Sequence, residues 1–261
     1  MINLQDKIVL ITGSTSGIGR ACAFQFGELG AKIALTGRDE DKLKNLKNEL
    51  LEKNINANFF VCDLLELESI TQLVSEIETY YKENVDILIN SAGVAVLGLV
   101  ENVSLSSLKE NFQLNFFASF LLSKLLIPGM RKKGFGQIIN LSSGVGKRGL
   151  PGASSYSASK FALNGFSESL RVELMKDNID VIVFSPGLVE TNFASSIILH
   201  GALKNKFTEG KSLKPDIVAF KIAMASQKRK REVTLSIKTK LGICLNFLFP
   251  RLLDKYLFRL L

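Results

Sequence analysis

The chain has 261 residues, of which 46% are apolar and 22% are charged, and its net charge is +8. These values exclude a disordered, collagen-like or repeat protein and fit one large domain or two small ones. Three scattered cysteines, one histidine, no secretion-signal pattern and no apolar run of about 18 residues predict a cytoplasmic protein without a disulfide framework, metal site or ordinary membrane span.

Short β-branched runs alternate with helical patterns along the chain. The expected strands are residues 7–12, 31–36, 57–62, 85–90, 137–142, 180–185 and 231–237. Apolar residues at helical spacing mark helices after residue 39, around 67–81, over 104–132 and 154–176, and from Pro215 onward. This order predicts an α/β fold: a doubly wound, Rossmann-type parallel sheet of seven strands in a single domain, residues 1–237.

The first expected strand runs into TGSTSGIG, residues 12–19. Glycine permits a tight turn and a close approach to a pyrophosphate, and the helix that follows offers free N–H groups and partial positive charge. The spacing is G-x-x-x-G-x-G, not the commoner G-x-G-x-x-G. The prediction of a dinucleotide-binding loop therefore depends largely on its position after the first strand. The cofactor-binding residues expected here are Gly13, Ser14, Ser16, Gly17, Ile18 and Gly19.

The second expected strand ends in Thr36, Gly37 and Arg38, without the carboxylate that would bind a free ribose 2′-hydroxyl. Arg38 can hold a 2′-phosphate through its planar guanidinium, so we predict NADP(H) over NAD(H). In the alternative, Arg38 is a solvated surface charge and Asp39 recognises the ribose. Asp39 is better placed to cap the following helix.

Four further motifs follow in order: NSAG at 90–93, LSSGVG at 141–146, YSASK at 156–160 and SPG at 185–187. Together with the glycine loop they resemble the classical short-chain dehydrogenase/reductase (SDR) family over about residues 5–190. The resemblance implies that Tyr156 is the general acid/base, that Lys160 contacts the nicotinamide ribose, that Ser143 is the catalytic serine and that Asn115 belongs to a proton relay.

The same resemblance assigns further cofactor contacts. It places Asp63 near the adenine ring, and it implies that Tyr156 and Lys160 also touch the cofactor. A second asparagine usual in the family is Ser91 here, which should leave the backbone contacts intact. The remaining residues expected to bind the cofactor are Asn90, Ala92, Gly93, Pro186, Gly187, Val189 and Thr191.

The chemistry of these side chains agrees with the resemblance. Hydride transfer to a ketone leaves negative charge on the carbonyl oxygen, and a proton must reach that oxygen. A lysine one helical turn after the tyrosine should lower the phenol pKa, and Ser143 can donate to the developing oxyanion. Taken singly, these residues have ordinary structural explanations, and Asn115 could be a common helix asparagine. The glycine loop favours the joint catalytic interpretation.

The resemblance implies that residues 188–226 cover the substrate, and the stretch 188–214 lacks strand periodicity. Its apolar side chains suit an apolar substrate, or they only anchor the loop; the sequence favours neither. His200 is expected to be incidental. The apolar residues in question are Phe193, Ile197, Ile198, Leu199, Leu203 and Phe207.

Residues 238–261 are expected to form a basic amphipathic extension. Residues 227–261 hold nine Lys/Arg and two Asp/Glu, including KRKR at 228–231. Apolar residues 252, 253, 256, 257, 260 and 261 line one side, and Arg251, Lys255 and Arg259 the other. The segment 228–261 suits an anionic membrane surface, or it packs on the protein itself or a partner subunit. Nucleic acid is not expected, because aromatic residues do not interleave the basic run.

The sequence thus predicts an NADP(H)-dependent enzyme that interconverts a ketone and a secondary alcohol on a small apolar substrate. The alternatives are a 3-oxoacyl reductase of fatty-acid synthesis and a non-catalytic NADP(H)-binding sensor or scaffold. This sequence lacks a short Asp-Gly-Gly tail found in many acyl-reductase relatives, which counts against the 3-oxoacyl reductase. The resemblance implies a homodimer or homotetramer.

Overall fold

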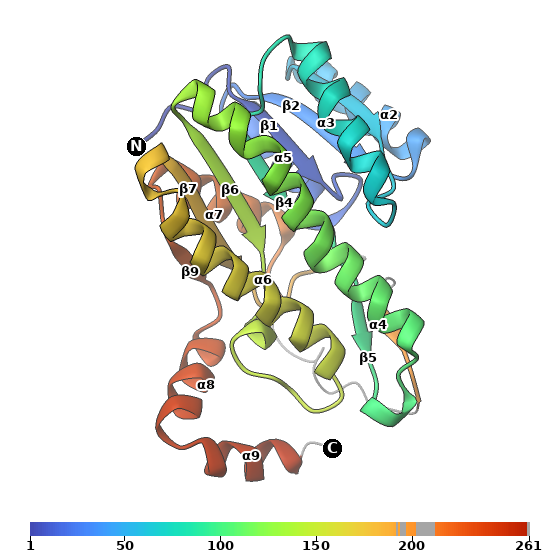
Figure 1. Ribbon diagram of the computed structural model, residues 1–261, viewed down its shortest axis with the longest axis vertical. Helices are drawn as coiled ribbons and strands as arrows, with labels where there is room; N and C mark the ends of the chain where they lie inside the picture. The colour runs from blue at the N-terminus through green and yellow to red at the C-terminus, as the bar shows by residue number, and fades with distance from the viewer. Residues whose placement is uncertain (192, 194–196, 202–211, 260–261) are drawn as a thin grey trace.

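The computed structural model describes residues 1–191, 193, 197–201 and 212–259. Its main sheet has seven parallel strands in the order β3-β2-β1-β4-β6-β7-β9 (Figure 1). The doubly wound seven-stranded sheet expected from the sequence is therefore confirmed. The strands are β1 (Ile8–Thr12), β2 (Lys32–Gly37), β3 (Ala57–Val61), β4 (Ile87–Asn90), β6 (Gly136–Leu141), β7 (Ile179–Ser185) and β9 (Glu232–Thr234).

Helices cover both faces of the sheet. Successive residues of β1 point to opposite faces: Val9 and Ile11 belong to one buried cluster, and Ile8 and Leu10 to the other. The first cluster includes residues of α1 (Gly17–Glu28), α2 (Glu40–Glu52) and α7 (Pro215–Gln227). The second includes residues of α3 (Leu67–Tyr81), α5 (Ala118–Lys133) and α6 (Ser154–Glu173). This double burial explains the continuous apolar runs of the strands.

A continuous helical stretch runs over Leu105–Lys133. It consists of α4 (Leu105–Phe112), a π-helical turn η2 (Gln113–Phe117) and α5. By length and composition alone it could cross a membrane, and 33% of its most apolar window is buried inside the fold. Leu122, Leu126 and Met130 of α5 belong to the second core cluster, so we interpret the stretch as a helix of the core.

A second, small sheet pairs β5 (Ala95–Leu97) with β8 (Ile197–Leu199) in parallel. Residues 197–199, within the stretch that lacks strand periodicity, therefore form a strand that the sequence did not indicate. A three-residue strand is too short to show a period of two, and its partner lies about a hundred residues away in the sequence. Leu203 and Phe207, expected in the substrate cover, lie outside the described residues.

The chain after β9 forms two helices, α8 (Ile237–Leu248) and α9 (Pro250–Phe258). The seventh strand ends at Thr234, earlier than expected, because Ser236 caps α8 by accepting a hydrogen bond from the Thr239 N–H at 3.2 Å. Pro250 opens α9, where its missing N–H costs nothing. Shorter helical turns are η1 (Val100–Asn102), η3 (Gly144–Gly146) and η4 (Met175–Asp177).

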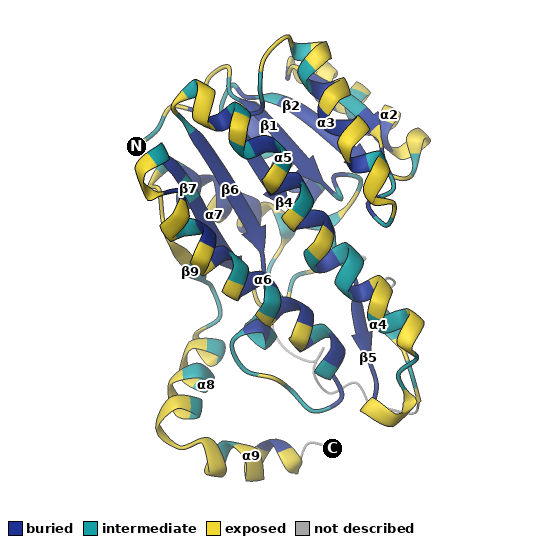
Figure 2. Cartoon of the chain, viewed as in Figure 1, coloured by how far each residue is buried: buried dark blue, intermediate teal, exposed yellow. Residues whose placement is uncertain are grey.

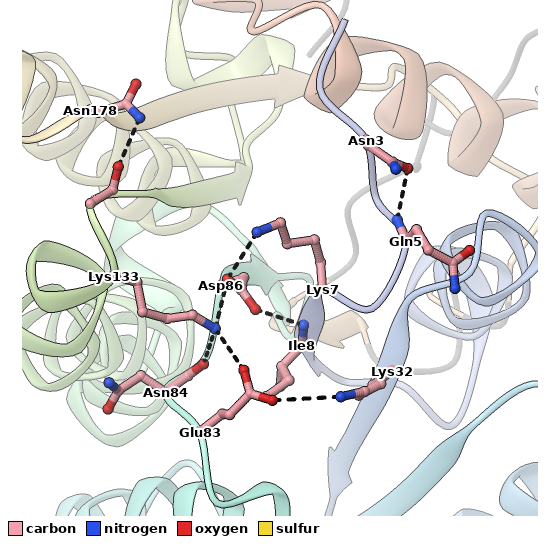
Figure 3. Close-up of polar contacts among 11 residues, drawn as sticks. Asn3, Gln5, Lys7, Ile8, Lys32, Glu83, Asn84, Asp86, Lys133 and Asn178 are labelled. Atoms are coloured by element: carbon pink, nitrogen blue, oxygen red, sulfur yellow. Dashed lines mark hydrogen bonds and ion pairs between the residues drawn. The ribbon is translucent and has the colours of Figure 1, made fainter.

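A buried carboxylate ties the strand ends opposite the glycine loop (Figure 3). Asp86, only 1% exposed, accepts a hydrogen bond from the Ile8 N–H at 2.9 Å and forms ion pairs with Lys133 at 2.8 Å and Lys7 at 3.5 Å. Lys133 also pairs with the half-exposed Glu83 at 3.4 Å. Because Asp86 precedes β4, these contacts fix β1, β4 and the end of α5 relative to one another.

We predict that Asp86→Ala lowers the free energy of unfolding by about 2–4 kcal/mol, since it removes the acceptor of a buried N–H and the partner of two ammonium groups. Urea titration followed by circular dichroism measures the change. The matched control is Glu83→Ala, which removes only surface ion pairs and should cost less than about 1 kcal/mol. Equal effects of the two substitutions would contradict the anchoring role of Asp86.

Candidate active site

The loop between β1 and α1 is shaped by glycines at positions where a side chain would be crowded or strained. Gly13 has φ +62°, and a Cβ on it would lie 2.9 Å from the Ala92 Cα. A Cβ on Gly19 would collide with the Gly13 carbonyl oxygen. Gly17 has φ +54°, with the Thr191 side chain 3.0 Å from its Cβ position. The loop therefore lies close to the segments after β4 and β7.

This loop fits the phosphates of a dinucleotide. The N-cap of α1, Ser16, makes no side-chain capping bond, and the first turn holds no acidic residue, so the helix N-terminus can face an anion. Ser14 binds the Thr36 carbonyl oxygen through its N–H at 3.2 Å and its hydroxyl at 3.1 Å. Ser16 is exposed, while Ile18 packs against the first core cluster.

The loop after β4 is held to β1 by a single hydroxyl. Thr12 Oγ1 accepts hydrogen bonds from the N–H groups of Ser91 and Ala92, both at 3.0 Å. Both bonds use backbone donors, so serine at position 91 leaves them intact. Asn90 is buried and donates to Asn140 Oδ1 at 2.8 Å.

At the end of β2, the two candidate recognition residues differ in their contacts. Asp39 caps α2 by accepting from the Lys42 N–H at 3.0 Å and pairs with the Lys42 ammonium at 2.7 Å. These contacts lower the pKa of Asp39. Arg38 is exposed, and no carboxylate pairs with it among the residues that the structure describes. Asp63, after β3, accepts from the Leu65 N–H at 3.0 Å.

The other expected side chains gather beyond β6. Ser143 follows this strand, close enough to Tyr156 in the first turn of α6 for its hydroxyl to lower the phenol pKa. Lys160, 5% exposed, lies one turn further and donates to the Leu141 carbonyl oxygen at 2.7 Å. Its Nζ is 5.9 Å from the centre of the Tyr156 ring. Serine, phenol and ammonium thus share one site.

The pKa values of the two titratable groups move in opposite directions. Burial raises the pKa of Tyr156 to about 12, against a smaller lowering by the Ser143 hydrogen bond. Burial also lowers the pKa of Lys160 to about 8. The sequence led us to expect that Lys160 lowers the phenol pKa; here the loss of hydration outweighs any such effect.

Asn115 lies on the π-helical turn and makes three hydrogen bonds there. Its Oδ1 accepts from the Val94 N–H at 2.9 Å, and its Nδ2 donates to the Val94 carbonyl oxygen at 2.9 Å and the Ser159 hydroxyl at 3.0 Å. A Cβ on Gly93 would lie 3.0 Å from Asn115 Oδ1 and 3.7 Å from Lys160 Nζ. Asn115, Lys160 and the loop after β4 therefore meet.

Two residues of this network escaped sequence reasoning. The Ser159 hydroxyl accepts from Asn115 and donates to the Tyr156 carbonyl oxygen at 2.8 Å. Asn111, fully buried, donates to the Val94 carbonyl oxygen at 2.9 Å. Their only sequence signal is spacing: Ser159 follows Tyr156 by three residues, and Asn111 precedes Asn115 by four. Both link α6 and α4 to the catalytic candidates.

The segment after β7 closes the remaining side. Pro186 is buried, and Gly187 follows with φ +83°. Val189 pairs with Leu213 in a short bridge, which joins the two ends of the stretch 188–214. The ring of Phe193 lies 6.4 Å from that of Tyr156. His200 contacts the Ser107 hydroxyl at 2.9 Å, outside the site.

The sheet order places this site at a switch point. β1 and β4 are neighbours, and the chain leaves β1 toward β2 and β3 on one side and leaves β4 toward β6 and β7 on the other. Ligands of doubly wound sheets bind at the carboxyl ends of the strands at this point. With its glycine loop there, the protein is of the Rossmann-type dinucleotide-binding class.

Comparisons with known proteins make the class more specific. The family model for short chain dehydrogenases matches residues 7–200. Dehydrogenase/reductase SDR family member 7B of Xenopus tropicalis is 34% identical over 266 residues, covering 97% of this chain and 85% of that protein. The chain therefore belongs to the short-chain dehydrogenase/reductase family of oxidoreductases.

Solved structures agree on the fold. A metagenomic short-chain oxidoreductase in complex with NADP is 28% identical, with a TM-score of 0.76 over 90% of this chain and 98% of that one. A short-chain dehydrogenase/reductase from Burkholderia phymatum in complex with NAD has a TM-score of 0.86 over 97% of this chain and 96% of that one. At 20% identity, this second likeness shows the fold alone.

The buried ammonium of Lys160 should leave a signature in the pH dependence of stability. Between pH about 8, its folded pKa, and about 10.5, its ordinary value, the unfolded chain binds a proton that the folded chain does not. Burial of the charged Lys160 therefore destabilises the fold to its full extent below this pH window. The destabilisation disappears as the pH rises through the window and the folded lysine loses its proton. Relative to Lys160→Met, wild type should therefore gain up to about 1.4 kcal/mol of unfolding free energy per pH unit within the window.

Urea titrations at pH 7, 8, 9 and 10 measure this difference. Lys124→Met removes an exposed lysine of α5 and serves as the matched control, which should show no comparable rise. A difference between wild type and Lys160→Met that stays constant from pH 7 to 10 would contradict a buried ammonium at this position.

Proposed function

We propose that this protein is an NADP(H)-dependent oxidoreductase that interconverts a ketone and a secondary alcohol on an apolar substrate. The observation that carries the proposal is the convergence of Ser143, Tyr156 and Lys160 beside Gly93, at the switch point of a dinucleotide-binding sheet. Family membership supports the reaction class, because the relatives are dehydrogenases and reductases by name.

Tyr156 is the proposed general acid. The bound nicotinamide cofactor supplies the hydride, and the protein supplies the proton and the field around it. With its pKa raised to about 12, the phenol is protonated at neutral pH and holds a proton for the carbonyl oxygen of a ketone. The Ser143 hydroxyl offers a second donor to the same oxygen. A protonated phenol is the form that reduction of a ketone requires.

Lys160 and Asn115 hold the groups that take part in this step in position. The hydrogen bond to the Leu141 carbonyl oxygen fixes the Lys160 ammonium between the end of β6 and the tyrosine ring. Asn115, bound to both polar groups of Val94 and to Ser159, fixes the loop after β4 and the backbone of Tyr156. Positioning these groups before the substrate arrives lowers the cost of reorganisation during the reaction.

The preference for NADP(H) rests on the surroundings of Arg38. The Ser14–Thr36 contacts bring the phosphate loop against the end of β2, two residues before Arg38. Arg38 is exposed, whereas Asp39 is engaged as a helix cap and in an ion pair with Lys42. A guanidinium free of carboxylates in the described chain suits a 2′-phosphate. The NADP complex of a 28% identical structure is consistent with this assignment.

An apolar substrate is supported by the cover of the site. Phe193 lies beside Tyr156, and the backbone of Val94 is bound to Asn115 of the same site. Part of the cover instead serves as an anchor: β8 pairs with β5, and His200 N–H binds the Leu97 carbonyl oxygen at 2.8 Å. The two interpretations of the cover thus apply to different residues. The free thiols of Cys22, Cys62 and Cys244 suit a reducing compartment such as the cytoplasm.

We also propose a homodimer or homotetramer, as the family resemblance implies. Helices α5 and α6 lie side by side on one face of the sheet (Figure 1). These two helices and the adjoining π-helical turn η2 expose Phe117, Phe120 and Phe161 by 43–46%, beside an aromatic cluster of Phe116, Phe120 and Phe166. Exposed aromatic side chains grouped in this way are typical of subunit interfaces.

Tyr156→Phe should lower kcat for NADPH-dependent reduction of apolar ketones by about 10²–10⁴-fold, because the acid loses its proton. NADPH oxidation with a panel of ketones measures turnover, and NADPH fluorescence measures binding, which should persist. The matched control is Tyr80→Phe, an exposed tyrosine of α3, with unchanged kcat. NADPH binding without turnover of any ketone by wild type would favour the sensor or scaffold instead.

Arg38→Ala should raise KM for NADPH about 10–100-fold and leave KM for NADH within about twofold, because only the 2′-phosphate loses a charged partner. Initial rates with each cofactor and one ketone give the comparison. Lys44→Ala removes an exposed cation from α2 and controls for the general loss of positive charge. If Arg38→Ala leaves the cofactor preference unchanged, Arg38 does not recognise the phosphate.

A further inference from the structure

The helices α8 and α9 carry a large exposed apolar surface, which we call the C-terminal surface. Figure 2 shows both helices projecting from the body of the fold and coloured as exposed over most of their length. Each of the large side chains concerned is 46–84% exposed, and such a grouping is unusual on a monomeric soluble protein. They are Ile237, Leu241, Leu245, Phe247, Leu248, Phe249, Leu252, Tyr256 and Phe258.

The packed side of these helices is narrow. Leu257 is buried, and Leu253 is half-buried, so the inner face of α9 does rest on the protein. Leu252 and Tyr256, which the sequence placed on the same apolar stripe, are 66% and 60% exposed. Packing on the subunit's own fold therefore accounts for only part of the stripe. Leu260 and Leu261, which complete it, lie outside the described residues.

The C-terminal surface is also basic. Residues 227–261 hold nine Lys/Arg against two Asp/Glu. Both acids are engaged within the body: Asp254 pairs with Arg148, and Glu232 with Lys147 at 3.4 Å. Within the described part of the chain, no carboxylate pairs with the five cations that flank the apolar side chains. These cations are Lys238, Lys240, Arg251, Lys255 and Arg259.

The positive charge favours one of two possible partners of the C-terminal surface, which are a second copy of this chain and an anionic lipid bilayer. A second copy would bring the same unpaired cations against one another, and like charges that meet at an interface oppose association. An anionic lipid bilayer offers phosphate and carboxylate groups to the cations and an apolar interior to the phenylalanine and leucine side chains. The combination of both features on adjacent helices therefore favours the bilayer.

The C-terminal surface is joined to the candidate active site. A Cβ on Gly144, the residue after Ser143, would lie 2.7 Å from the Thr239 side chain in the first turn of α8. A Cβ on Gly187 would lie 3.2 Å from the Ser236 Cβ, at the cap of the same helix. The Arg148–Asp254 ion pair ties α9 to the loop between η3 and α6. The start of α8 thus packs against two segments of the site.

We propose that α8 and α9 dock on the surface of an anionic bilayer and hold the mouth of the active site against it. The ketone substrate is then a membrane-resident amphiphile with an apolar chain, which reaches the site from the lipid. The statement about the substrate rests on the oxidoreductase function proposed above, whereas the docking surface does not.

Docking is tested with the full chain and sedimented vesicles. Wild type should bind vesicles of phosphatidylcholine with phosphatidylserine at least about tenfold more strongly than vesicles of phosphatidylcholine alone, and added salt should weaken the binding. The double variant Phe247→Asp/Leu252→Asp should lose at least about tenfold. Val172→Asp/Met175→Asp, at two exposed apolar positions at the far end of α6 and in η4, is the matched control and should bind as wild type does.

A charge-reversal variant separates the two contributions. Arg251→Glu/Lys255→Glu leaves the apolar side chains in place and should lose the preference for phosphatidylserine. Circular dichroism confirms that each variant is folded. Absence of wild-type binding to either vesicle would overturn the proposal. So would an oligomer that dissociates in Phe247→Asp/Leu252→Asp while no vesicle binding occurs, because a second copy would then cover the surface.

Activity distinguishes this proposal from the enzymatic one. With a short, water-soluble ketone, Phe247→Asp/Leu252→Asp should turn over as wild type does. With a long-chain ketone presented in phosphatidylserine vesicles, its rate should fall at least about tenfold. Vesicle binding without turnover of any ketone would retain the docking surface and reject the enzyme. Equal loss with both ketones would reject the delivery of substrate from the membrane.

Discussion

The whole site depends on how closely the chain after β1 approaches the chain after β4. Thr12 holds the N–H groups of Ser91 and Ala92, and at Gly13 a single added carbon would come within 2.9 Å of the Ala92 Cα. Two loops separated by nearly eighty residues can meet in this way only because β1 and β4 are neighbours in the sheet. The same contact places the phosphate loop beside Gly93, and through Gly93 beside Asn115 and Lys160. The candidate cofactor-binding and catalytic residues are thus held in one geometric arrangement.

Buried polar groups at the candidate site destabilise the fold, and contacts at the opposite ends of the strands stabilise it. Lys160 is buried with its charge opposed by desolvation, and Asn115 occupies a π-helical turn, a conformation that is rare and found mostly at functional positions. Each side chain nevertheless has defined hydrogen-bond partners, which keeps the buried polar groups in one arrangement. The opposite ends of the strands carry the compensating order: Asp86, equally buried, joins two lysines and a backbone N–H where no chemistry is required.

The sequence predicts most of this arrangement because most of its signals are local. Strands buried on both faces read as apolar runs, and six of the seven were located to within two residues at each end. Gly13, Ser143 and Tyr156 follow or precede such elements at fixed distances, so their convergence follows from the parallel sheet. What escaped prediction is tertiary. The β5–β8 pair, the Asn111 and Ser159 hydrogen bonds and the π-helical turn depend on contacts between distant segments. The direction of the Tyr156 pKa was missed because burial cannot be read from a helix spacing.

The positive charge of the chain is concentrated in its C-terminal segment and not in the part that holds the candidate site. Seven of the eight net positive charges fall within residues 227–261, so the catalytic body is close to neutral. A nearly neutral body is not attracted electrostatically to an anionic surface. Helices α8 and α9, by contrast, combine unpaired cations with exposed phenylalanine and leucine side chains. Because α8 begins against Gly144 and Gly187, any surface that binds these helices comes to lie beside the site. On the proposals made above, the tail therefore places the reaction at the membrane surface, and the body carries it out.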